Sequence, residues 1–540
     1  MQRFKIKITL YYKQMAGGLM QLVAYGAQDL YLTGNPQITF FKMIYRRYTN
    51  FSMEYIPQYF RVLPTFSTTQ RNQLTVKIDR NADLLHDCYV LIDLPNIYST
   101  EAERFQWVEN LGENFIASAE ITVNGLVIDK HYSNWLNIWA QLTITRSKRR
   151  AYDEITGNVW QMRYPDKYYG NYSPTTKPSI AARRLYIPLL FWFCVNPGLS
   201  IPLISLQYTE IYMNIEFRAL NELFTMWYGL SPDSIYEFGK NGTSPTTGVP
   251  AFDRQLFQAI QDAELPSVPA AELVDSLELA GFGPLNYFWL FVNGTQAPNG
   301  IWTQNSYLFC NYIYLDEDER RRFAQTSHEY LITQCQRQVF GGIDGQQVLD
   351  LKISQPVKEI IFTTQRNDVN VVNQWTNYTN CLYYDSLYDV SFVKNAFNFR
   401  LQREFYENNI DPCLPDVQQQ FDRTNQYDID QNNIFFSGKL ILNGNDRFDE
   451  RDSVFWNWQE AYKYHTNSPD YGIYMYSFSL QPEDFQPSGS CNFSRINRAQ
   501  LQLNLRQLVN TEIEYDIVVY SHSMNVFRIM GGIGSVVFSN

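Results

Sequence analysis

The sequence contains few of the residues that build metal or catalytic sites. Only five of its 540 residues are histidine, and no two of them have the H-E-x-x-H spacing or another spacing typical of metal ligands. It also lacks a G-x-x-x-x-G-K-[ST] phosphate loop and a G-x-S-x-G nucleophile elbow. The acidic pairs Asp449/Glu450 and Glu483/Asp484 suit glycosidase chemistry, but adjacent acids are common in turns. We therefore predict no enzyme activity and no catalytic, cofactor-binding or metal-binding residues.

Cysteine is also sparse, with seven residues and no C-x-x-C pair. An odd number of widely spaced cysteines indicates buried thiols in a reducing compartment and not a disulfide framework. Residues 1–14 alternate apolar side chains with Lys or Thr, unlike the uninterrupted apolar core of a signal peptide. We therefore expect a protein that is not secreted. Six N-x-[ST] sequons leave the presence and sites of glycosylation open.

Positive charge is in deficit, because 44 Lys and Arg residues face 55 Asp and Glu residues and the net charge is −11. Proteins that coat nucleic acid depend on clustered Lys and Arg, so we predict no direct nucleic-acid partner. Basic clusters lie at residues 147–150 and 320–322, and acidic residues 316–319 directly precede the second. We interpret both clusters as solvated or intersubunit salt-bridge faces.

One segment, residues 40–48, interleaves aromatic and basic side chains as a nucleic-acid binder does. Its apolar residues Phe41, Ile44, Tyr45 and Tyr48 recur at i, i+3, i+4 and i+7. This spacing favours an amphipathic helical turn that packs against the body of the protein.

The longest uncharged run, residues 185–209, is long enough to cross a bilayer. It contains Pro188, Pro197 and Pro202, each of which removes a helical hydrogen bond. The turn signal Asn196-Pro197-Gly198 divides it into two segments of strand length. We therefore predict two buried strands joined by a turn, and no transmembrane segment.

Aromatic residues are abundant, with 39 Tyr, 36 Phe and 11 Trp. Tyr and Phe suit pleated, half-buried surfaces and large contacts, so this excess favours a β-rich protein with extensive interfaces. Short strand-like segments recur along the chain, one of them with an Asn124-Gly125 hairpin turn. The clearest are residues 73–78, 88–94, 120–128, 210–217, 306–315, 347–353 and 512–520.

Two helices are expected among these strands. Residues 133–142 carry apolar side chains at helical spacing, which indicates an amphipathic helix packed on a sheet. A second helix begins at Asp316, where Asp316 and Glu319 have the spacing of a capping box. The pairs Glu317/Arg321 and Asp318/Arg322 then add i, i+4 ion pairs.

Six blocks of sequence resemble one family. Residues 15–51 (MAGGLMQLVAYGAQDLYLTGNPQITFFKMIYRRYTNF) are similar to the N-terminus of the major capsid proteins of nucleocytoplasmic large DNA viruses. Residues 191–217 resemble the end of the first jelly roll of that family, and residues 312–331 resemble the entry into the second. The C-terminal motifs are matched by residues 442–451, 476–496 and 525–540.

The resemblance gives a structural role to a set of motif residues and assigns none of them to a catalytic, cofactor or metal site. These residues are Gly34, Asn35, Pro36, Arg46, Arg47, Asn196, Pro197, Gly198, Asp316, Glu319, Arg320, Arg321, Arg322, Gly444, Asp446, Arg447, Pro487, Gly489, Cys491, Asn492, Arg495 and Arg528. Among them, Pro487 and Gly489 would form a turn before a strand that carries Cys491 and Phe493.

The fold that the resemblance implies is all-β: a double jelly roll of two eight-stranded antiparallel sandwiches, with a few short helices and long surface loops. We expect an N-terminal arm at residues 1–34 and a first jelly roll at 35–222. A connecting segment at 223–300 contains the loop-like residues 240–250. The second jelly roll follows at 301–540, with a long polar excursion at about 367–433.

The function implied is that of a structural major capsid protein of a large icosahedral double-stranded DNA virus. Homotrimers that look hexagonal would tile the outer shell of the virion and contact minor capsid and penton proteins. They would reach an internal viral membrane only through minor proteins. Synthesis and assembly are expected in the host cytoplasm or a viral factory.

Two other functions remain open at this point: a double-jelly-roll scaffold that shapes an immature virion membrane, and a carbohydrate-binding or carbohydrate-active β-sandwich. Family members typically begin at the equivalent of Met15. Residues 1–14 are therefore either an authentic basic arm or an extension that the virion protein lacks, and we favour the extension.

Overall fold

The computed structural model describes residues 26–64, 70–98, 103–163, 178–228, 306–370, 373–380, 433–506 and 514–538, together with Leu22, Phe66 and two short strands. Residues 1–14, the expected linker at 240–250 and most of the polar excursion at 367–433 lie outside this part of the chain. By internal contacts the chain divides into two units, Met1–Asn50 and Phe51–Asn540.

The first unit contains the short helix α3 (Asp29–Thr33), which ends where the Gly34 N–H donates to the Leu30 carbonyl at 2.9 Å. The helical turn predicted for residues 40–48 is wrong, because the chain there forms a bend and then runs without regular structure. Within this unit Phe41 is 98% exposed and Tyr48 85%. A short amphipathic segment gains its helical stability mainly from packing, and among the described residues of this unit these side chains are exposed.

The second unit begins with a β-sandwich of eight main strands. In chain order these strands are β1 (Phe51–Gln58), β2 (Asn72–Lys77), β3 (Leu84–Leu94), β6 (Ile116–Val123), β7 (Leu126–Tyr132), β8 (Arg183–Pro188), β10 (Ile211–Phe217) and β14 (Tyr307–Leu315). One sheet has the order β1-β14-β3-β8 and the other β2-β10-β6-β7, and all pairs are antiparallel. Numbered one to eight, the sheets run 1-8-3-6 and 2-7-4-5, which is the strand order of a jelly roll.

Strand β14 belongs to this first sandwich, although we placed the beginning of the second jelly roll at residue 301. It lies between β1 and β3, pairing Phe51 with Leu315 and Cys88 with Cys310. Without β14 the sheet would split and expose two strand edges in the interior of the unit, so the segment after β10 must return to fill this position.

A second sandwich repeats the order. Its strands are β15 (His328–Ile343), β16 (Gln346–Leu351), β17 (Pro356–Arg366), β18 (Phe435–Leu442), β19 (Asn445–Asp446), β21 (Ile473–Ser477), β23 (Ala499–Leu505) and β24 (Tyr515–Met530). The sheets run β15-β24-β17-β21 and β16-β23-β18-β19, again 1-8-3-6 and 2-7-4-5. The predicted all-β class with two eight-stranded sandwiches is therefore confirmed. Short strands extend these sheets: β9 (Ile201–Pro202), β20 (Arg451–Asp452), β22 (Cys491–Asn492) and β25 (Ile533–Val536).

Smaller elements decorate both sandwiches. One small sheet pairs β5 (Glu103–Trp107) with β11 (Phe224–Tyr228), and another joins β4 (Ile97–Tyr98), β12 (Phe291–Val292) and β13 (Thr295–Gln296). The remaining helices and turns are α4 (Leu111–Phe115), α6 (Arg146–Thr156), α7 (Trp160–Arg163), α17 (Glu460–Tyr464), η2 (Leu220–Glu222), η3 (Asn367–Asn370), η4 (Phe455–Gln459) and η5 (Phe493–Arg495).

The two predicted helices are both present. Helix α5 (Ser133–Thr143) is amphipathic as expected. Helix α12 (Glu317–Gln325) begins after Asp316, but the predicted capping box does not form, because the Asp316 side chain makes no cap hydrogen bond. The Asp316 carbonyl accepts the Arg320 N–H at 2.8 Å, as the ordinary helical bond requires.

The uncharged run at residues 185–209 is only partly extended. Strands β8 and β9 bracket the helical turn α8 (Trp192–Val195) and the 3-10 turn η1 (Pro197–Leu199), where we expected two strands and one turn. Burial agrees with the prediction, since Trp192 and Phe193 are both in the core. Among the helices that the structure describes, none has the length and apolar character needed to cross a membrane.

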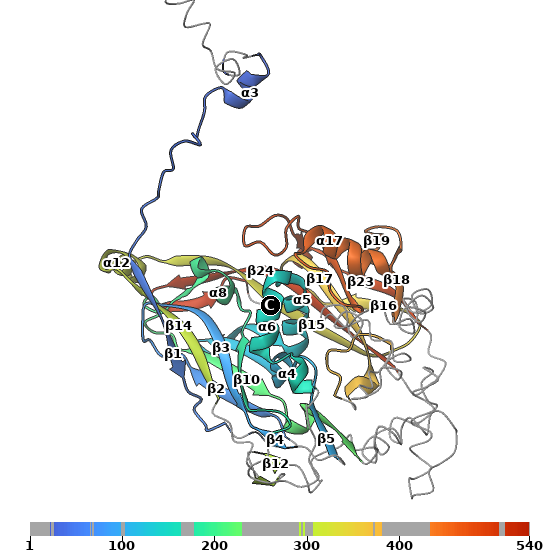
Figure 1. Cartoon of the computed structure of the whole chain (residues 1–540). Helices are drawn as coiled ribbons and strands as arrows, with labels where there is room; N and C mark the ends of the chain where they lie inside the picture. The colour runs from blue at the N-terminus through green and yellow to red at the C-terminus, as the bar shows by residue number, and fades with distance from the viewer. Residues whose placement is uncertain are drawn as a thin grey trace, which may run out of the picture. The chain divides into compact units, whose positions relative to one another are not determined.

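The two sandwiches meet across α5 (Figure 1). Trp135, Ile138 and Leu142 of α5 pack in one buried cluster with Ile361 of β17 and Tyr520 of β24. The apolar face of α5 thus covers the β15-β24-β17-β21 sheet of the second sandwich, so each sandwich stabilises the other through burial of this face.

Hydrogen bonds reinforce this junction at both ends of the contact. The backbone N–H of Cys335 on β15 donates to Oδ1 of Asp129 on β7 at 3.1 Å. The C-terminal hairpin β24–β25 reaches back to the first sandwich, where the Gly532 carbonyl accepts from Tyr208 N–H and from the Thr209 hydroxyl, at 3.2 and 3.0 Å. The junction is therefore a cohesive interface and not a flexible linker.

Candidate functional site

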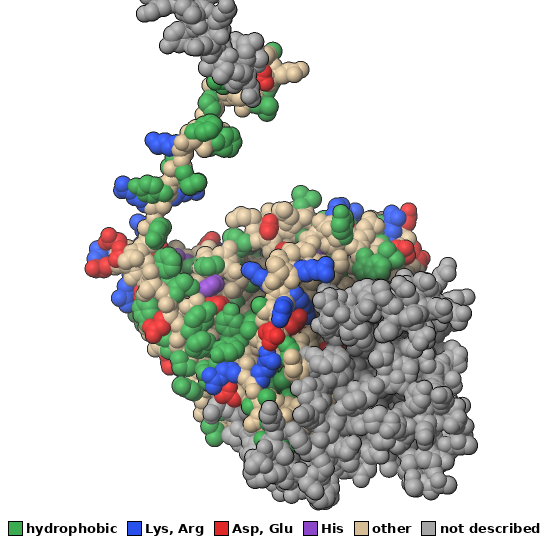
Figure 2. All heavy atoms as spheres, viewed as in Figure 1, with side chains coloured by type: hydrophobic (Ala, Val, Ile, Leu, Met, Phe, Trp, Pro, Cys, Tyr) green, Lys and Arg blue, Asp and Glu red, His purple; other side chains and the backbone are tan. Residues whose placement is uncertain are grey.

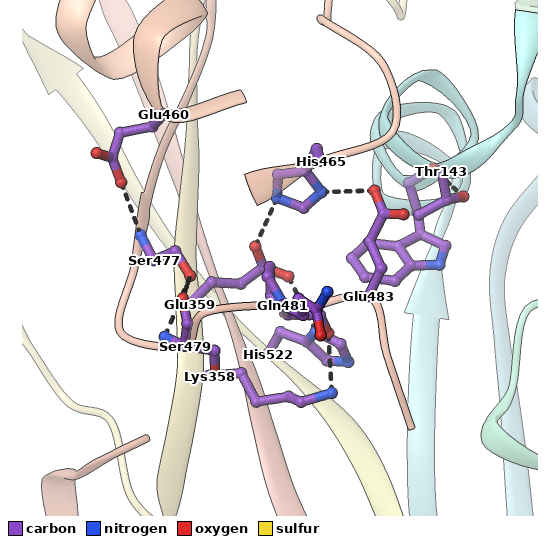
Figure 3. Close-up of polar contacts among 12 residues, drawn as sticks. Thr143, Lys358, Glu359, Glu460, His465, Ser477, Ser479, Gln481, Glu483 and His522 are labelled. Carbon is purple, nitrogen blue, oxygen red and sulfur yellow. Dashed lines mark hydrogen bonds and ion pairs between the residues drawn. The ribbon is translucent and has the colours of Figure 1, made fainter. Parts of the chain in front are cut away.

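A group of buried ionisable side chains lies at this junction. Glu359 on β17 is fully buried and contacts two histidines, His465 and His522 (Figure 3). Nε2 of His465 lies 2.8 Å from Oε2 of Glu359, and Nδ1 of His522 lies 3.0 Å from Oε1. Glu359 and His522 face each other across the β17–β24 pair, so strand register brings them together.

His465 follows α17 and bridges two carboxylates. Its second ring nitrogen, Nδ1, lies 2.9 Å from Oε1 of Glu483, and this oxygen also accepts the Thr466 N–H at 2.8 Å. Beside it, Nζ of Lys358 donates to the carbonyls of Pro482 and Asp484, each at 2.8 Å. Figure 3 shows the His465 ring pointing to Glu359 on one side and to Glu483 on the other.

Helix α5 of the first sandwich covers one side of the cluster. The Trp139 ring packs edge-on against His522, with ring centroids 4.8 Å apart. The loop after His465 is tied to the end of α5, because Asn467 N–H donates to the Leu142 carbonyl at 3.0 Å. The cluster therefore lies against the first sandwich, and the side chains of Glu359 and His465 are withdrawn from solvent.

Burial and charge act in opposite directions on these groups. Burial disfavours the charged ring of His465, but the charge of Glu359 and the hydrogen bonds to Glu359 and Glu483 outweigh it and raise its pKa to about 9. Burial alone would raise the pKa of Glu359, yet the charge and hydrogen bonds of His465 hold it well below the ordinary value. Burial dominates at His522 and lowers its pKa. At neutral pH the cluster therefore holds a Glu359 carboxylate, a His465 cation and a neutral His522.

The arrangement fits a structural role. Both nitrogens of His465 are occupied by carboxylates, and no group of three His, Cys, Asp or Glu side chains in the described residues is placed to hold a metal ion. A buried ion pair of this kind contributes mainly to the specificity of packing, because desolvation offsets most of its attraction. The ionisable members of the cluster all belong to the second sandwich, and Trp139 of the first sandwich packs against His465 and His522, so the pair lies at the junction.

Sequence reasoning missed this cluster. His465 lies 106 residues from Glu359, and His522 lies 163 residues from it, so no local spacing marks the group. Glu483 was considered only as half of an adjacent acidic pair. The one usable signal is a charged residue, Glu359, within the apolar strand segment β17, since a buried carboxylate needs a partner.

The motif residues named from the sequence are distributed over turns and strand ends and do not converge. In the first unit, Gly34 ends α3, Asn35 has a positive φ of 51°, Pro36 follows, and Arg46 and Arg47 are exposed. In the turn before η1, Oδ1 of Asn196 accepts the Gly198 N–H at 2.9 Å, and Pro197 is the first residue of η1.

The charged motif residues of α12 make intramolecular contacts. Arg320 lies 2.9 Å from the buried carboxylate of Asp83, and Arg321 lies 2.9 Å from Glu317, as predicted. The predicted pair between Asp318 and Arg322 does not form, and both side chains are exposed. Glu319 is half-buried.

The C-terminal motif residues also lie in tight turns. Gly444, with φ of 80°, forms the β18–β19 turn together with Asn443. The Asp446 carboxylate binds Nζ of Lys439 at 2.7 Å, and the Arg447 N–H donates to the Leu440 carbonyl.

The last motif residues surround β22. Gly489 has φ of 130° and lies two residues after Pro487, while Cys491 and Asn492 form β22. We expected Phe493 to lie in the strand with Cys491. It belongs instead to the 3-10 turn η5, together with Arg495. Arg528 pairs with Glu329 across β24 and β15 at 2.7 Å.

The basic cluster at residues 147–150 lies on α6, where it is balanced by acidic neighbours. Arg149 pairs with Asp153 at 3.0 Å, and Arg183 of β8 pairs with Glu154. Figure 2 shows Lys and Arg side chains intermixed with Asp and Glu over this face. This supports the interpretation of a salt-bridge face.

Comparison with known proteins decides the family. Residues 319–535 match the model of the large eukaryotic DNA virus major capsid protein, and residues 39–237 match that of the major capsid protein N-terminus. The major capsid protein of Phaeocystis pouchetii virus is 35% identical to this chain over 97% of its length and 100% of the relative. This chain belongs to the major capsid proteins of large eukaryotic DNA viruses. The major capsid protein of Paramecium bursaria Chlorella virus 1 is 30% identical, with 97% of this chain and 100% of the relative covered.

Solved structures of this capsid protein family have the same fold. VP54 of PBCV-1 superimposes with a TM-score of 0.61 and 24% identity, covering 93% of this chain and all of that one. The Faustovirus major capsid protein gives 0.60 at 12% identity, covering 94% of each chain. The two sandwiches of this major capsid protein are therefore the double jelly roll of its family, as the six sequence blocks implied.

Proposed function

We propose that this major capsid protein assembles as a homotrimer with a nearly hexagonal outline and that these trimers tile the outer shell of an icosahedral virion. The observation that carries the proposal is the repetition of one strand order in two sandwiches held together across α5. Two similar sandwiches per chain give six per trimer, so a threefold particle can occupy lattice positions that have six neighbours.

The domain division belongs to the same proposal. An arm at residues 1–34 precedes the first jelly roll at 35–222, which β14 completes. Residues 223–300 form a connecting segment, and the second jelly roll follows with its excursion at about 367–433. Long insertions between paired strands are tolerated because the entropy of loop closure grows slowly with length.

The partners proposed are further copies of the chain, minor capsid proteins and penton proteins. An internal viral membrane would be contacted through minor proteins, and the genome would not be contacted directly, in keeping with the net charge of −11. Assembly in the host cytoplasm or a viral factory and the absence of a catalytic role complete the proposal.

The oligomeric state of the purified full chain tests the proposal. Sedimentation velocity or mass photometry at micromolar concentration is expected to give a trimer. A chain that remains monomeric under these conditions contradicts it. Mass spectrometry of mature particles separates a shell protein from a scaffold, since a scaffold that is discarded after assembly would be missing from them.

The exposed face of α12 is proposed as a flank between trimers. Arg321 is already paired with Glu317, whereas Arg322 is exposed and makes no ion pair with any residue that the structure describes. If trimers associate through such charges, added salt weakens their association. Arg322→Gln is expected to reduce that salt dependence, while Arg498→Gln, which removes an exposed charge on the second sandwich, leaves it unchanged. Association that does not respond to salt indicates apolar contacts instead.

A further inference from the structure

Residues 40–48 of the first unit, the apolar segment, combine side chains that usually form binding surfaces. The segment contains six large apolar side chains and three basic ones, and it has no acidic residue. All nine residues are exposed, and residues 42–50 make no hydrogen bond or ion pair with any residue that the structure describes. A contiguous exposed apolar surface of this kind marks a site of interaction with another molecule. The apolar segment therefore has the character of a binding element.

Strand β1 has a second feature without a partner, a free sheet edge. It pairs with β14 in unbroken register along its eight residues, and no strand that the structure describes pairs with its other edge. Its first five residues are exposed and include neither Lys nor Pro. Phe51 and Met53, on the same face, are 52% and 45% exposed. Proteins usually protect an edge with Lys, Pro or a bulge, so this edge is open to the addition of another strand.

The charges of the two features are complementary. Strand β14 ends at Leu315 opposite the first residue of β1, so the acidic residues 316–319 follow at this end of the edge. Among them, Asp318 is exposed and has no ion pair within the described chain. The apolar segment carries Arg46 and Arg47 near its C-terminal end. A segment that runs antiparallel to β1 brings these two guanidinium groups to the acidic end of the edge, whereas a parallel segment brings them to the opposite end.

The charge of the whole chain points to the same kind of partner. Residues 1–50 carry seven basic residues and one acidic residue, a net charge of +6. The rest of the chain carries 37 basic and 54 acidic residues, a net charge of −17. The basic N-terminal unit of one copy is therefore attracted to the acidic remainder of another. A second copy also offers backbone donors and acceptors at its β1 edge, which the surface of a membrane lacks.

We propose that the apolar segment of one copy adds as an antiparallel strand to the free edge of β1 in a neighbouring copy. Backbone hydrogen bonds join the two strands, and the aromatic side chains of the segment cover the exposed apolar side chains of β1. Because the segment directly precedes β1 in the sequence, the exchange is reciprocal around a twofold axis. A threefold trimer contains no such axis, so the exchange joins neighbouring trimers. The inference thus rests on the proposed homotrimer.

Photo-cross-linking of the full chain tests this contact. Benzoylphenylalanine takes the place of Tyr45, and sedimentation velocity follows the species larger than a trimer as the chain concentration is raised. In these species we expect a cross-linked product of twice the chain mass on a denaturing gel, with the cross-link in residues 51–58. The same group at Tyr462, an exposed residue of α17, should give no cross-link to β1. Trimers that do not associate further, or that associate without the cross-link from position 45, overturn the inference.

Proline variants test the backbone pairing. Neighbouring residues of a strand direct their N–H groups to opposite sides, so Met43→Pro/Ile44→Pro removes one N–H that faces β1. This variant is expected to weaken association between trimers about tenfold or more. Gln37→Pro/Ile38→Pro is the matched control, because it changes exposed residues of the same unit outside the apolar segment. Its association should equal that of the unaltered chain. Equal effects of the two variants contradict the pairing.

Failure of this inference is distinguishable from failure of the proposed function. A chain that stays monomeric contradicts the homotrimer itself. Normal trimers whose association is unchanged by Met43→Pro/Ile44→Pro contradict the strand exchange alone. Flotation with phosphatidylserine vesicles examines a membrane as the partner. Vesicle binding that requires residues 40–48, together with absence of the cross-link, assigns the apolar segment to a lipid surface and overturns the inference.

Discussion

Nε2 of His465 lies 2.8 Å from Oε2 of Glu359, and neither side chain is exposed to solvent. One partner follows α17 and the other lies in the middle of the second sandwich, while Trp139 of the first sandwich covers the pair. A charged pair in this position links the packing of the two jelly rolls to the ionisation of one histidine. The stability of the major capsid protein should therefore depend on both partners and on pH.

Replacing Glu359 by Gln leaves the His465 cation buried with only Glu483 as a counter-charge. Breaking a buried pair in this way is expected to lower the free energy of unfolding by about 3–5 kcal/mol. The control is Glu329→Gln, which breaks a surface pair with Arg528 and should cost about 0–1 kcal/mol. Urea denaturation followed by tryptophan fluorescence measures both. Equal losses in the two variants would show that the buried pair contributes no more to the free energy of unfolding than a surface pair does.

The pH dependence of stability follows from the raised pKa of His465. Because its pKa in the folded chain, about 9, is above the unfolded value of 6.5, its contribution is complete below pH 6.5 and is lost as pH rises through 9. The shift corresponds to roughly 3 kcal/mol. The destabilisation caused by His465→Gln should therefore be large near pH 6 and much smaller near pH 10. A penalty that is the same at both values contradicts this assignment.

On the acid side the sign reverses. The pKa of Glu359 is depressed by His465, so its contribution is present above its unfolded value near 4.5 and is lost as pH falls. The lowered pKa of His522 acts in the same direction as pH falls below 6.5. Thermal unfolding between pH 7 and pH 4 should show a falling melting temperature in the unaltered chain. The fall should be shallower in a Glu359→Gln/His522→Gln double variant, which lacks both groups.

Gly489 requires a conformation that other residues rarely adopt. Its φ is 130°, and an added Cβ would lie 3.0 Å from the Phe478 carbonyl oxygen. Gly489→Val is therefore expected to destabilise the chain by about 1–3 kcal/mol. Gly198→Ala is the control, because its φ is not positive and its nearest neighbour is a side-chain oxygen at 3.3 Å. Melting temperatures of the two variants measure the difference. Similar melting temperatures would show that position 489 does not require glycine.

Two facing thiols should be protected from modification. Cys88 and Cys310 are buried opposite each other on β3 and β14, with their Sγ atoms 3.4 Å apart. Burial raises the pKa of Cys88, which keeps it as the unreactive thiol. Iodoacetamide labelling read by peptide mass spectrometry is expected to modify Cys88 and Cys310 only after denaturation. Rapid labelling of either in the native protein would show that β14 detaches readily.

Local patterns in the sequence predicted the elements that depend on near neighbours. The Asn124-Gly125 pair gave a hairpin with φ of 54° and 79°, and the apolar spacing of residues 133–142 gave α5. Where a pattern required a partner surface, prediction was less successful. The helical turn at 40–48, which needed a surface to pack against, did not form. The capping box at Asp316 is a local pattern, and it failed as well, because the Asp316 side chain makes no cap hydrogen bond.

The sequence by itself determined the β-rich class, the positions of several strands and turns, and, through its six blocks, membership of the capsid protein family. The tertiary structure alone decided that β14 completes the first sandwich and that Glu359, His465 and His522 form one buried cluster. The reason is physical: hydrophobic alternation and turn chemistry act between neighbours in the chain, whereas strand order and the pairing of buried charges are set by contacts between segments more than a hundred residues apart.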